Sequence, residues 1–426
     1  MEIQGRIESK IAQGEFLGNM LLAVRSEGPR LEQVFVEHVS VLAERLNVFL
    51  RANGHIQKVD YNPAEFWPAQ RGRAFGFVDG GVAAIDLPGA APLGIRVGSY
   101  VVRPGDDSES REEFKPEFSI VDDLYAAEPS TYDLPEDLDD RYDDRAKLRD
   151  AARIISEIAA SLALWRRRQD IAVMLVHGPL INPAAPYGPP KFPYFTADAA
   201  QALFGAPVAP EQRHFVPLYR RILEELKAVG APVFGVVERD GGGRPVLERL
   251  IFKMHEEGSL PEAEKKAALA LLRKYSLSDA QILDVVLESG EYLTPISIPR
   301  QEPKNKWPDN WKDRLSGYPD PLTTFLKPSE TVRPFRIEAF EGQDYEEAIK
   351  LILATARLLP GYGFPVALDI VDKFAKVPSW LSKGIGASHK AVLLRKAFET
   401  EDRKLQEYAI KMLSVSSRDW FFRPKA

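Results

Sequence analysis

Apolar residues recur along this chain at two spacings, which predict two kinds of element. Segments rich in β-branched and aromatic residues and broken by glycine are typical of strands, whereas apolar residues three and four apart indicate helices. Continuous apolar runs indicate strands that are covered on both faces. We expect strands at 74–87, 93–102, 118–121, 170–177, 231–237 and 334–340, and helices at 147–168, 212–229, 261–289, 344–359 and 364–376.

The order of these elements predicts an α/β fold, in which a mixed β-sheet is flanked by helices. Three strands precede the first long helix, and helices and strands alternate after it. We expect a helical lead-in over residues 1–60, a main domain over 61–380 and a helical tail over 381–426. Within the main domain we expect an acidic insertion at 106–144 and a helical insertion at about 255–330.

Composition narrows the chemistry that the chain can perform. Its 426 residues are 45% apolar and 28% charged, as in ordinary globular proteins. The absence of cysteine excludes disulfides, thiolate zinc sites and cysteine nucleophiles, so any metal must bind to oxygen or imidazole. We find neither a signal peptide nor an apolar run of about 20 residues that could span a membrane, and we expect a cytoplasmic protein.

Charge is distributed unevenly along the chain. Residues 106–144 contain sixteen acidic and three basic residues, a local net charge of −13, which leaves the rest of the chain at +7 against −6 for the whole. A mildly basic body permits a nucleic-acid backbone as a ligand. Ordinary surface charge beside a solvated acidic loop explains these values equally well.

Asp79 is the first candidate for chemistry. It follows the apolar residues Phe75 to Val78 and precedes Gly80 and Gly81, which allow another backbone or a phosphate to approach closely. A carboxylate at the end of that strand is placed for a ligand. The alternative is an Asp-Gly turn between two strands of a hairpin, and for this fragment alone the turn is the favoured interpretation.

Two further candidates lie on the next helix and the next strand. Glu157 is at the edge of an apolar helix face, where a buried carboxylate needs a cation or hydrogen bonds. Its alternative is to reach solvent or to pair with Arg153. His177 ends the following strand and faces the same edge as Asp79 if the two strands are neighbours. Its imidazole suits manganese better than magnesium, and a hydrogen-bonded structural role is the alternative.

The helix expected at 364–376 carries Asp369 and Asp372 three residues apart, so that one face could present both carboxylates. Lys373 and Lys376 lie on the same helix and could contact phosphate. The alternative is that these are exposed charges of an amphipathic helix, and for Asp369 this alternative is favoured.

Together these positions bring acidic groups from a first strand, a long helix, the end of a later strand and a final helix. Phosphodiester hydrolysis needs an activated water and a stabilised leaving oxygen, and two divalent cations about 3.5 to 4 Å apart provide both. Such hard cations need carboxylate oxygens from several elements around one cleft. The sequence contains no Ser-His-Asp, Walker A, GxGxxG or zinc-type histidine motif that competes with this interpretation.

Several short motifs in a shared order resemble those of the NurA nuclease family. Residues 77–81 (Phe-Val-Asp-Gly-Gly) look like the family's first strand motif, and Arg153 to Glu157 look like its helical Arg-then-Glu motif. Residues 176–180 (Val-His-Gly-Pro-Leu) look like the end of a later strand. The motifs that continue the order lie at 278–283, 289–291, 334–338 and 364–372.

The resemblance implies an RNase H-like fold and a nuclease that uses two manganese or magnesium ions. It also implies 5′–3′ exonuclease and single-strand endonuclease activity, a homodimer, and a HerA-type hexameric ATPase as partner in DNA end processing or phage defence. The metal-binding and catalytic residues that it implies are Asp79, Glu157, His177 and Asp372. The residues that we expect to contact DNA are Arg153, Arg239, Lys373 and Lys376.

The chain departs from the family's pattern at three positions. His177 stands where the family usually has a metal-binding aspartate, so one anionic ligand is replaced by a neutral one and metal affinity should fall. Phe364 stands where tyrosine is common, and Glu238 stands where a basic residue is usual. Two hypotheses follow: an active metal-dependent deoxyribonuclease, or a weakened or inactive DNA-binding scaffold subunit of a HerA-type complex.

Overall fold

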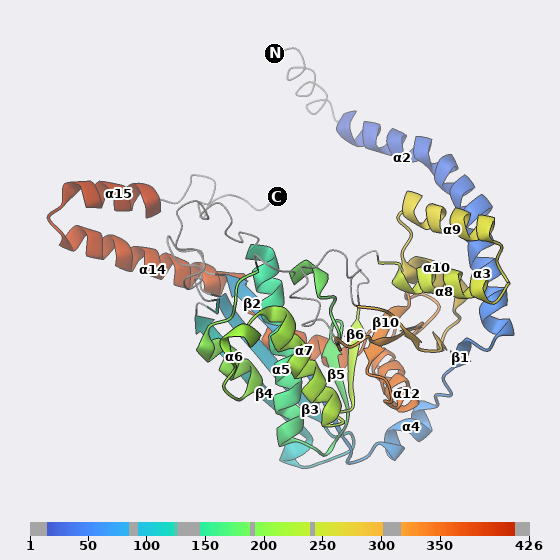
Figure 1. The fold of residues 1–426 in the computed structure, drawn as a ribbon, viewed down its shortest axis with the longest axis horizontal. Helices are drawn as coiled ribbons and strands as arrows, with labels where there is room; N and C mark the ends of the chain where they lie inside the picture. The colour runs from blue at the N-terminus through green and yellow to red at the C-terminus, as the bar shows by residue number, and fades with distance from the viewer. Residues whose placement is uncertain are drawn as a thin grey trace. The chain divides into compact units, whose positions relative to one another are not determined.

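A computed structural model describes residues 15–84, 93–122, 124–125, 145–187, 192–238, 243–300 and 317–413 (Figure 1). The chain divides into two compact units, which we describe separately. The smaller unit contains residues 1–59, 239–296 and 324–336. The larger unit contains residues 60–238, 297–323 and 337–426.

Ten strands form one mixed sheet. They are β1 (Ile56–Lys58), β2 (Ala74–Ala84), β3 (Leu93–Val102), β4 (Glu112–Asp122), β5 (Ile171–His177), β6 (Val233–Val237), β7 (Glu291–Leu293), β8 (Ile296–Ser297), β9 (Leu322–Leu326) and β10 (Phe335–Ala339). Their order is β1-β7-β9-β10-β6-β5-β2-β3-β4, with β8 paired to β9. In the larger unit, β2, β3 and β4 are antiparallel, whereas β2, β5 and β6 are parallel. The predicted α/β class with a mixed sheet is therefore confirmed.

Helices accompany the strands in both units. Those of the larger unit are α4 (Pro63–Ala69), α5 (Arg145–Arg167), α6 (Ala197–Phe204), α7 (Phe215–Ala228), α12 (Tyr345–Ala356), α13 (Val366–Ala375), α14 (Ser379–Glu399) and α15 (Arg403–Leu413). Those of the smaller unit are α2 (Glu15–Val34), α3 (Ser40–Ala52), α8 (Pro245–Glu256), α9 (Glu262–Lys274) and α10 (Asp279–Val286), with a π-helical turn at Phe35–Val39. No helix in the described ranges is long and apolar enough to cross a lipid bilayer.

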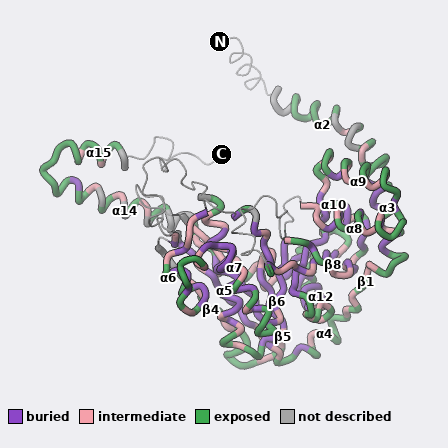
Figure 2. Tube along the Cα trace, viewed as in Figure 1, coloured by how far each residue is buried: buried purple, intermediate pink, exposed green. Residues whose placement is uncertain are grey.

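The core of the larger unit lies between the sheet and α5, with α7 beside α5 (Figure 2). Apolar residues of α5 at helical spacing, including Ile154, Ile158 and Leu162, are all less than 5% exposed. The predicted helix at 147–168 is thus confirmed, and its apolar stripe faces the sheet. The parallel strands β5 and β6 are buried, as their continuous apolar runs predicted.

In the smaller unit, polar residues of the motifs at 278–283 and 289–291 hold helices and strands together. Ser278 caps α10 in a capping box with Gln281, and buried Asp279 accepts hydrogen bonds from two backbone nitrogens in the first turn of α8. Glu291 of β7 accepts two hydrogen bonds of 3.0 and 2.9 Å from the guanidinium of Arg51 in α3. These motif residues therefore have a structural role.

Several element boundaries differ from the predicted ones. The helical segment expected at 261–289 is two helices, because Ser276 takes a positive φ of 51° between α9 and α10 and Ser278 starts the second. The sequence pattern did not predict α8 or β9. Part of the acidic segment at 106–144 forms β4, and residues 126–144 lie outside the described residues.

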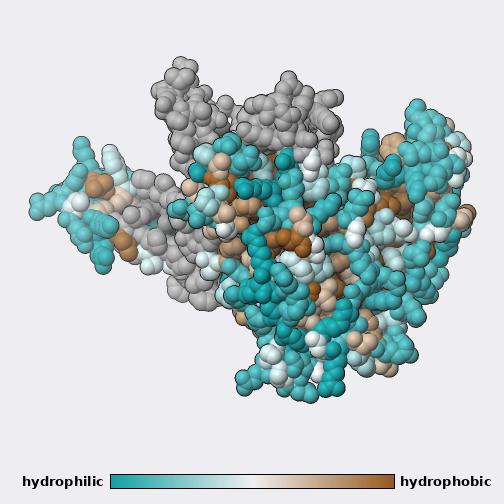
Figure 3. Space-filling model, turned by 60° about the horizontal axis from the view of Figure 1, so that its bottom comes forward, coloured by the Kyte–Doolittle hydropathy of each residue, from teal (hydrophilic) through white to brown (hydrophobic). Residues whose placement is uncertain are grey.

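Large apolar side chains are also exposed, and Figure 3 shows apolar groups separated by hydrophilic residues on one face of the molecule. Phe114 of β4 is 43% exposed, and Ile370 of α13 is 37% exposed. Single exposed apolar residues are common on protein surfaces. Phe114 matters further because of the residues that it contacts, as described below.

Gly235 of β6 supports the turn that follows β5. A Cβ atom at this position would lie 2.3 Å from the nitrogen of Leu180 and 2.7 Å from the carbonyl oxygen of Gly178. Because both are backbone atoms, Gly235→Ala should lower the free energy of unfolding by about 1 to 3 kcal/mol. Gly384→Ala in α14 is the control, since nothing lies within 4 Å there and alanine favours a helix. Equal melting temperatures of the two variants would contradict this packing.

Candidate metal centre

Asp79 of β2, His177 of β5 and Asp372 of α13 meet at one place. Each offers one ligand atom, and these atoms all lie within 4.8 Å of one another. His177 Nδ1 lies 2.8 Å from Asp79 Oδ2. Asp79 is only 4% exposed, whereas His177 and Asp372 are half-buried, so the group is partly accessible to solvent. Three of the four expected ligands are thus brought together.

The sheet places Asp79 beside His177. β2 and β5 are neighbouring parallel strands in which Val78 pairs with Val176, so the next residue of each strand lies at the same level. Because side chains alternate along a strand, Asp79 and His177 project to the same face. The sequence analysis placed His177 at the same edge as Asp79 on the condition that the two strands are neighbours, and the structure meets this condition.

Two glycines bring Asp372 to the same face. A Cβ atom on Gly81 would lie 2.6 Å from the carbonyl oxygen of Ala375, and one on Gly98 would lie 2.5 Å from a ring carbon of Phe374. Gly98 is the residue of β3 that pairs with Asp79. The last turn of α13 therefore rests directly on the sheet because these positions carry no side chain.

The structure corrects our interpretation of Asp79 itself. β2 continues through Asp79 and Gly80 to Ala84, and it remains paired with β3 over this length. Asp79 is therefore in the middle of a long strand, neither at the strand's end nor in an Asp-Gly hairpin turn. The predicted role of the glycines as points of close backbone approach is confirmed, since Ala375 lies against Gly81.

Glu157 of α5 lies on the other face of the sheet. Its Cγ and Oε1 would be 2.9 and 3.0 Å from a Cβ atom on Gly80, the residue after Asp79. It is not a member of the 4.8 Å group, and its carboxylate accepts a hydrogen bond of 2.8 Å from Arg153. The structure thus shows the pairing of Glu157 with Arg153 that the sequence analysis gave as an alternative. The role of Glu157 as a metal ligand stays a prediction.

Burial and like charge shift the protonation of these groups. Burial raises the pKa of Glu157 to about 7, with a further contribution from the negative charge of Asp79, although Arg153 opposes both. Burial and the charge of Asp79 also raise the pKa of Asp372. Crowded carboxylates of this kind are stabilised by a cation.

His177 responds in the opposite way to burial. Burial lowers the pKa of its imidazole, but the hydrogen bond and negative charge of Asp79, together with the charges of Glu157 and Asp372, outweigh it and raise the pKa. The ring of Phe364 lies 5.4 Å from that of His177. Two carboxylates and an imidazole form a donor set that fits a divalent cation such as manganese.

The expected DNA-contacting residues have different surroundings. Arg153 binds the carboxylate of Asp150 at 2.9 Å as well as that of Glu157, and Lys373 binds Asp369 at 2.6 Å. Lys376 is exposed and forms no ion pair with another described residue. Arg239 lies outside the described residues.

Sequence reasoning missed the residues that hold Arg153. Asp150 accepts a hydrogen bond of 2.7 Å from the hydroxyl of Tyr187 while it binds the guanidinium of Arg153. The i,i+3 spacing of Asp150 and Arg153 on one helix was the only local signal for this contact. Tyr187 lies 37 residues further along the chain and gave no signal.

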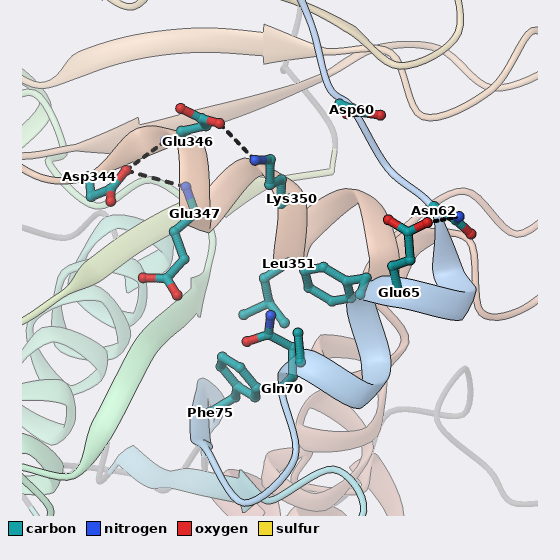
Figure 4. Close-up of a pocket in the computed structure, with 12 residues that line it drawn as sticks. Asp60, Asn62, Glu65, Gln70, Phe75, Asp344, Glu346, Glu347, Lys350 and Leu351 are labelled. Carbon is teal, nitrogen blue, oxygen red and sulfur yellow. Dashed lines mark hydrogen bonds and ion pairs between the residues drawn. The ribbon is translucent and has the colours of Figure 1, made fainter.

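A hollow of about 510 Å³ near α4 and α12 has the wrong chemistry for a phosphate ligand (Figure 4). Its charged lining residues are Asp60, Glu65, Asp344, Glu346, Glu347 and Lys350. Asp344 caps α12 and Lys350 pairs with Glu346, so part of this charge stabilises the helix itself. None of the three grouped ligands lines this hollow, and we do not place the functional site there.

The family model of the NurA domain matches residues 73–377, so this chain belongs to the NurA family. The NurA nuclease from Sulfolobus solfataricus has a similar structure, with a TM-score of 0.51 and 11% sequence identity over 90% of this chain and 98% of that chain. This likeness confirms the fold that the resemblance implied.

Two other solved structures are similar at lower TM-scores. NurA bound to dAMP and manganese has a TM-score of 0.37 and 13% identity over 83% of this chain and 94% of that chain. The catalytic domain of human Endonuclease V has a TM-score of 0.30 and 14% identity over 82% and 98%. A comparison with curated protein sequences gave no match.

The pairing of Glu157 with Arg153 can be tested by its effect on stability. Breaking a buried ion pair costs about 3 to 5 kcal/mol, and Arg153→Met should cost less than this because the Arg153 side chain is 30% exposed. The double variant Arg153→Met/Glu157→Gln should recover part of the loss, since a neutral amide needs no counter-charge. Denaturant unfolding of Arg153→Met, Glu157→Gln and the double variant measures the coupling, and strictly additive losses would contradict it.

Proposed function

We propose that this chain is a divalent-metal-dependent deoxyribonuclease that hydrolyses phosphodiester bonds at the centre formed by Asp79, His177 and Asp372. The convergence of these three ligands within 4.8 Å is the observation that carries the proposal. Membership of the NurA family supports it, because nuclease activity is what the resemblance to that family implies. Manganese is the preferred ion because one ligand is an imidazole.

We further propose a site for two ions, which Asp79, His177, Asp372 and Glu157 would hold together. The charge of Asp79 raises the pKa values of both Asp372 and Glu157, which lie on opposite faces of β2, so Asp79 is the carboxylate that is close to both. When bound, divalent cations lower the pKa of the attacking water and stabilise the leaving oxygen.

The residues of the chain hold and orient the reacting groups. The hydrogen bond between His177 and Asp79 fixes the orientation of the imidazole, and the hydrogen bond and positive charge of Arg153 favour the ionised form of the buried Glu157 carboxylate. Lys376 follows the last turn of α13, four residues after Asp372, and is the exposed cation that we assign to a substrate phosphate.

The finer activity and the partners are proposals that rest on family membership. We propose 5′–3′ exonuclease and single-strand endonuclease action by a homodimer that works with a HerA-type hexameric ATPase in DNA end processing or phage defence. Degradation of 5′- and 3′-labelled strands measures the polarity, and co-purification with such an ATPase tests the partner. A protein that cleaves no DNA yet stimulates the ATPase would instead be the scaffold subunit.

Removal of the Asp79 carboxylate should abolish cleavage. We expect Asp79→Asn to reduce manganese-dependent degradation of linear DNA by about 100-fold or more, and chelator to abolish it in the unaltered protein. Asp369→Asn is the control, since Asp369 lies on the same helix as Asp372 but binds Lys373. The melting temperature with and without manganese reports metal binding separately. Undiminished cleavage by Asp79→Asn would remove this assignment.

His177 should determine which metal the centre uses. Aspartate is a harder and anionic ligand, so we expect His177→Asp to need less magnesium for half-maximal cleavage and to prefer manganese less strongly. His177→Ala, which supplies no ligand atom, should be weaker with both metals. Activity titrations with each metal test this, and an unchanged ratio of the two half-maximal concentrations in His177→Asp would show that His177 is not a ligand.

A further inference from the structure

Four side chains form a row on the sheet beside the metal centre. The guanidinium of Arg96 lies 4.7 Å from the ring centre of Phe374, which lies 5.5 Å from the ring of Phe114. Phe114 in turn stacks on Tyr100, with 4.3 Å between ring centres and 18° between ring planes. We call Arg96, Phe374, Phe114 and Tyr100 the aromatic row.

The aromatic row begins next to the metal ligands. Phe374 is two residues after Asp372 on α13, and its ring covers Gly98, which pairs with Asp79 in the sheet. From there the row continues over β3 to Phe114 on β4. A polymer with one of its phosphates at the metal centre could therefore place neighbouring units on the row.

The exposure of the row is unusual for stacked aromatic residues. Tyr100 is 6% exposed and forms a buried base, while Phe114 above it is 43% exposed. The stacking on Tyr100 covers one face of the Phe114 ring and leaves the residue partly exposed, and an exposed aromatic ring of this kind is what a nucleobase stacks on.

The charges next to the row favour a polyanion. Arg96 lies over the ring of Phe374, Lys376 is exposed at the end of α13, and neither forms an ion pair with another described residue. The acidic neighbour of Phe114 on the same face of β4 is Glu112, which lies 3.9 Å from Arg111. Proteins that bind single strands combine cations that follow the backbone with aromatic rings that stack on bases.

We infer that the aromatic row binds the unpaired bases of a single DNA strand that leads to the metal centre. This inference rests on the proposed function, since the row lies beside the metal centre at which that strand would be cleaved. Bases in a duplex are stacked on one another and are not free to stack on Phe114. The row thus selects an unpaired segment next to the bond that is cleaved.

A hollow of about 330 Å³ lies beside the row. It offers an alternative to DNA, because an apolar surface of a partner protein could bind to the row and the hollow. It is lined by Phe77, Tyr100 and Ile370 among other apolar residues. A protein would bury Phe114 without any need for bases, so a ligand that lacks bases distinguishes the two occupants. We favour the DNA strand because of the cations and the neighbouring metal ligands.

The experiment compares an oligothymidylate with a strand of the same length that carries abasic sites, using fluorescence anisotropy in chelator so that no cleavage occurs. We expect the unaltered protein to bind the oligothymidylate about tenfold more tightly, and Phe114→Ala to bind the two strands equally. Phe114→Tyr should restore the preference because it keeps a ring. Phe252→Ala is the matched control, since Phe252 is 41% exposed and also has a cation, Lys265, over its ring.

Each outcome supports or overturns the inference. Equal binding of both strands by the unaltered protein would overturn it, and so would a loss in Phe114→Ala that is the same for both strands. Because binding is measured without metal, an inactive centre leaves this result unchanged and affects the proposed nuclease alone. Conversely, if Phe114→Ala cleaves normally and keeps its preference for the strand with bases, the inference about the aromatic row is wrong and the proposed nuclease function is unaffected.

Discussion

The close approach of α13 to the sheet is the contact on which the metal centre depends. Side chains at Gly81 and Gly98 would overlap Ala375 and Phe374, so the helix reaches β2 and β3 only because both positions are glycine. This contact sets Asp372 within 4.8 Å of the ligand atoms of Asp79 and His177. It also presses Phe374 onto β3, which connects the metal centre to the aromatic row.

Each of three consecutive residues of β2 has its own role: Asp79, Gly80 and Gly81. Asp79 supplies the carboxylate, Gly80 leaves room for Glu157 on the α5 face, and Gly81 leaves room for the end of α13 on the other face. Because side chains alternate along a strand, two adjacent glycines open both faces next to a single acid. The same Asp-Gly-Gly sequence in a hairpin turn would not allow a helix to approach each face of the sheet. The position of the motif within a strand therefore determines what its glycines do.

The sequence allowed prediction of the elements whose pattern is decided locally. Buried parallel strands and the long helix α5 were predicted from continuous or helical apolar spacing, and the family motifs indicated which acids to compare. β9 was missed because Thr323 and Thr324 are both buried, which breaks any apolar alternation. The pairing of Arg51 with Glu291 joins residues 240 positions apart, and no local pattern contains it.

The charges of the centre explain how a histidine at position 177, compared with an aspartate, changes the repulsion between the carboxylates and the attraction for a cation. Burial and mutual repulsion already raise the pKa values of Glu157 and Asp372, so a further carboxylate in place of His177 would add negative charge where ionisation is already opposed. The imidazole removes this repulsion and forms a hydrogen bond with Asp79 instead. The same exchange removes part of the attraction for a cation and replaces a hard ligand by a softer one. For the metal-binding role that we propose, this composition favours manganese over magnesium.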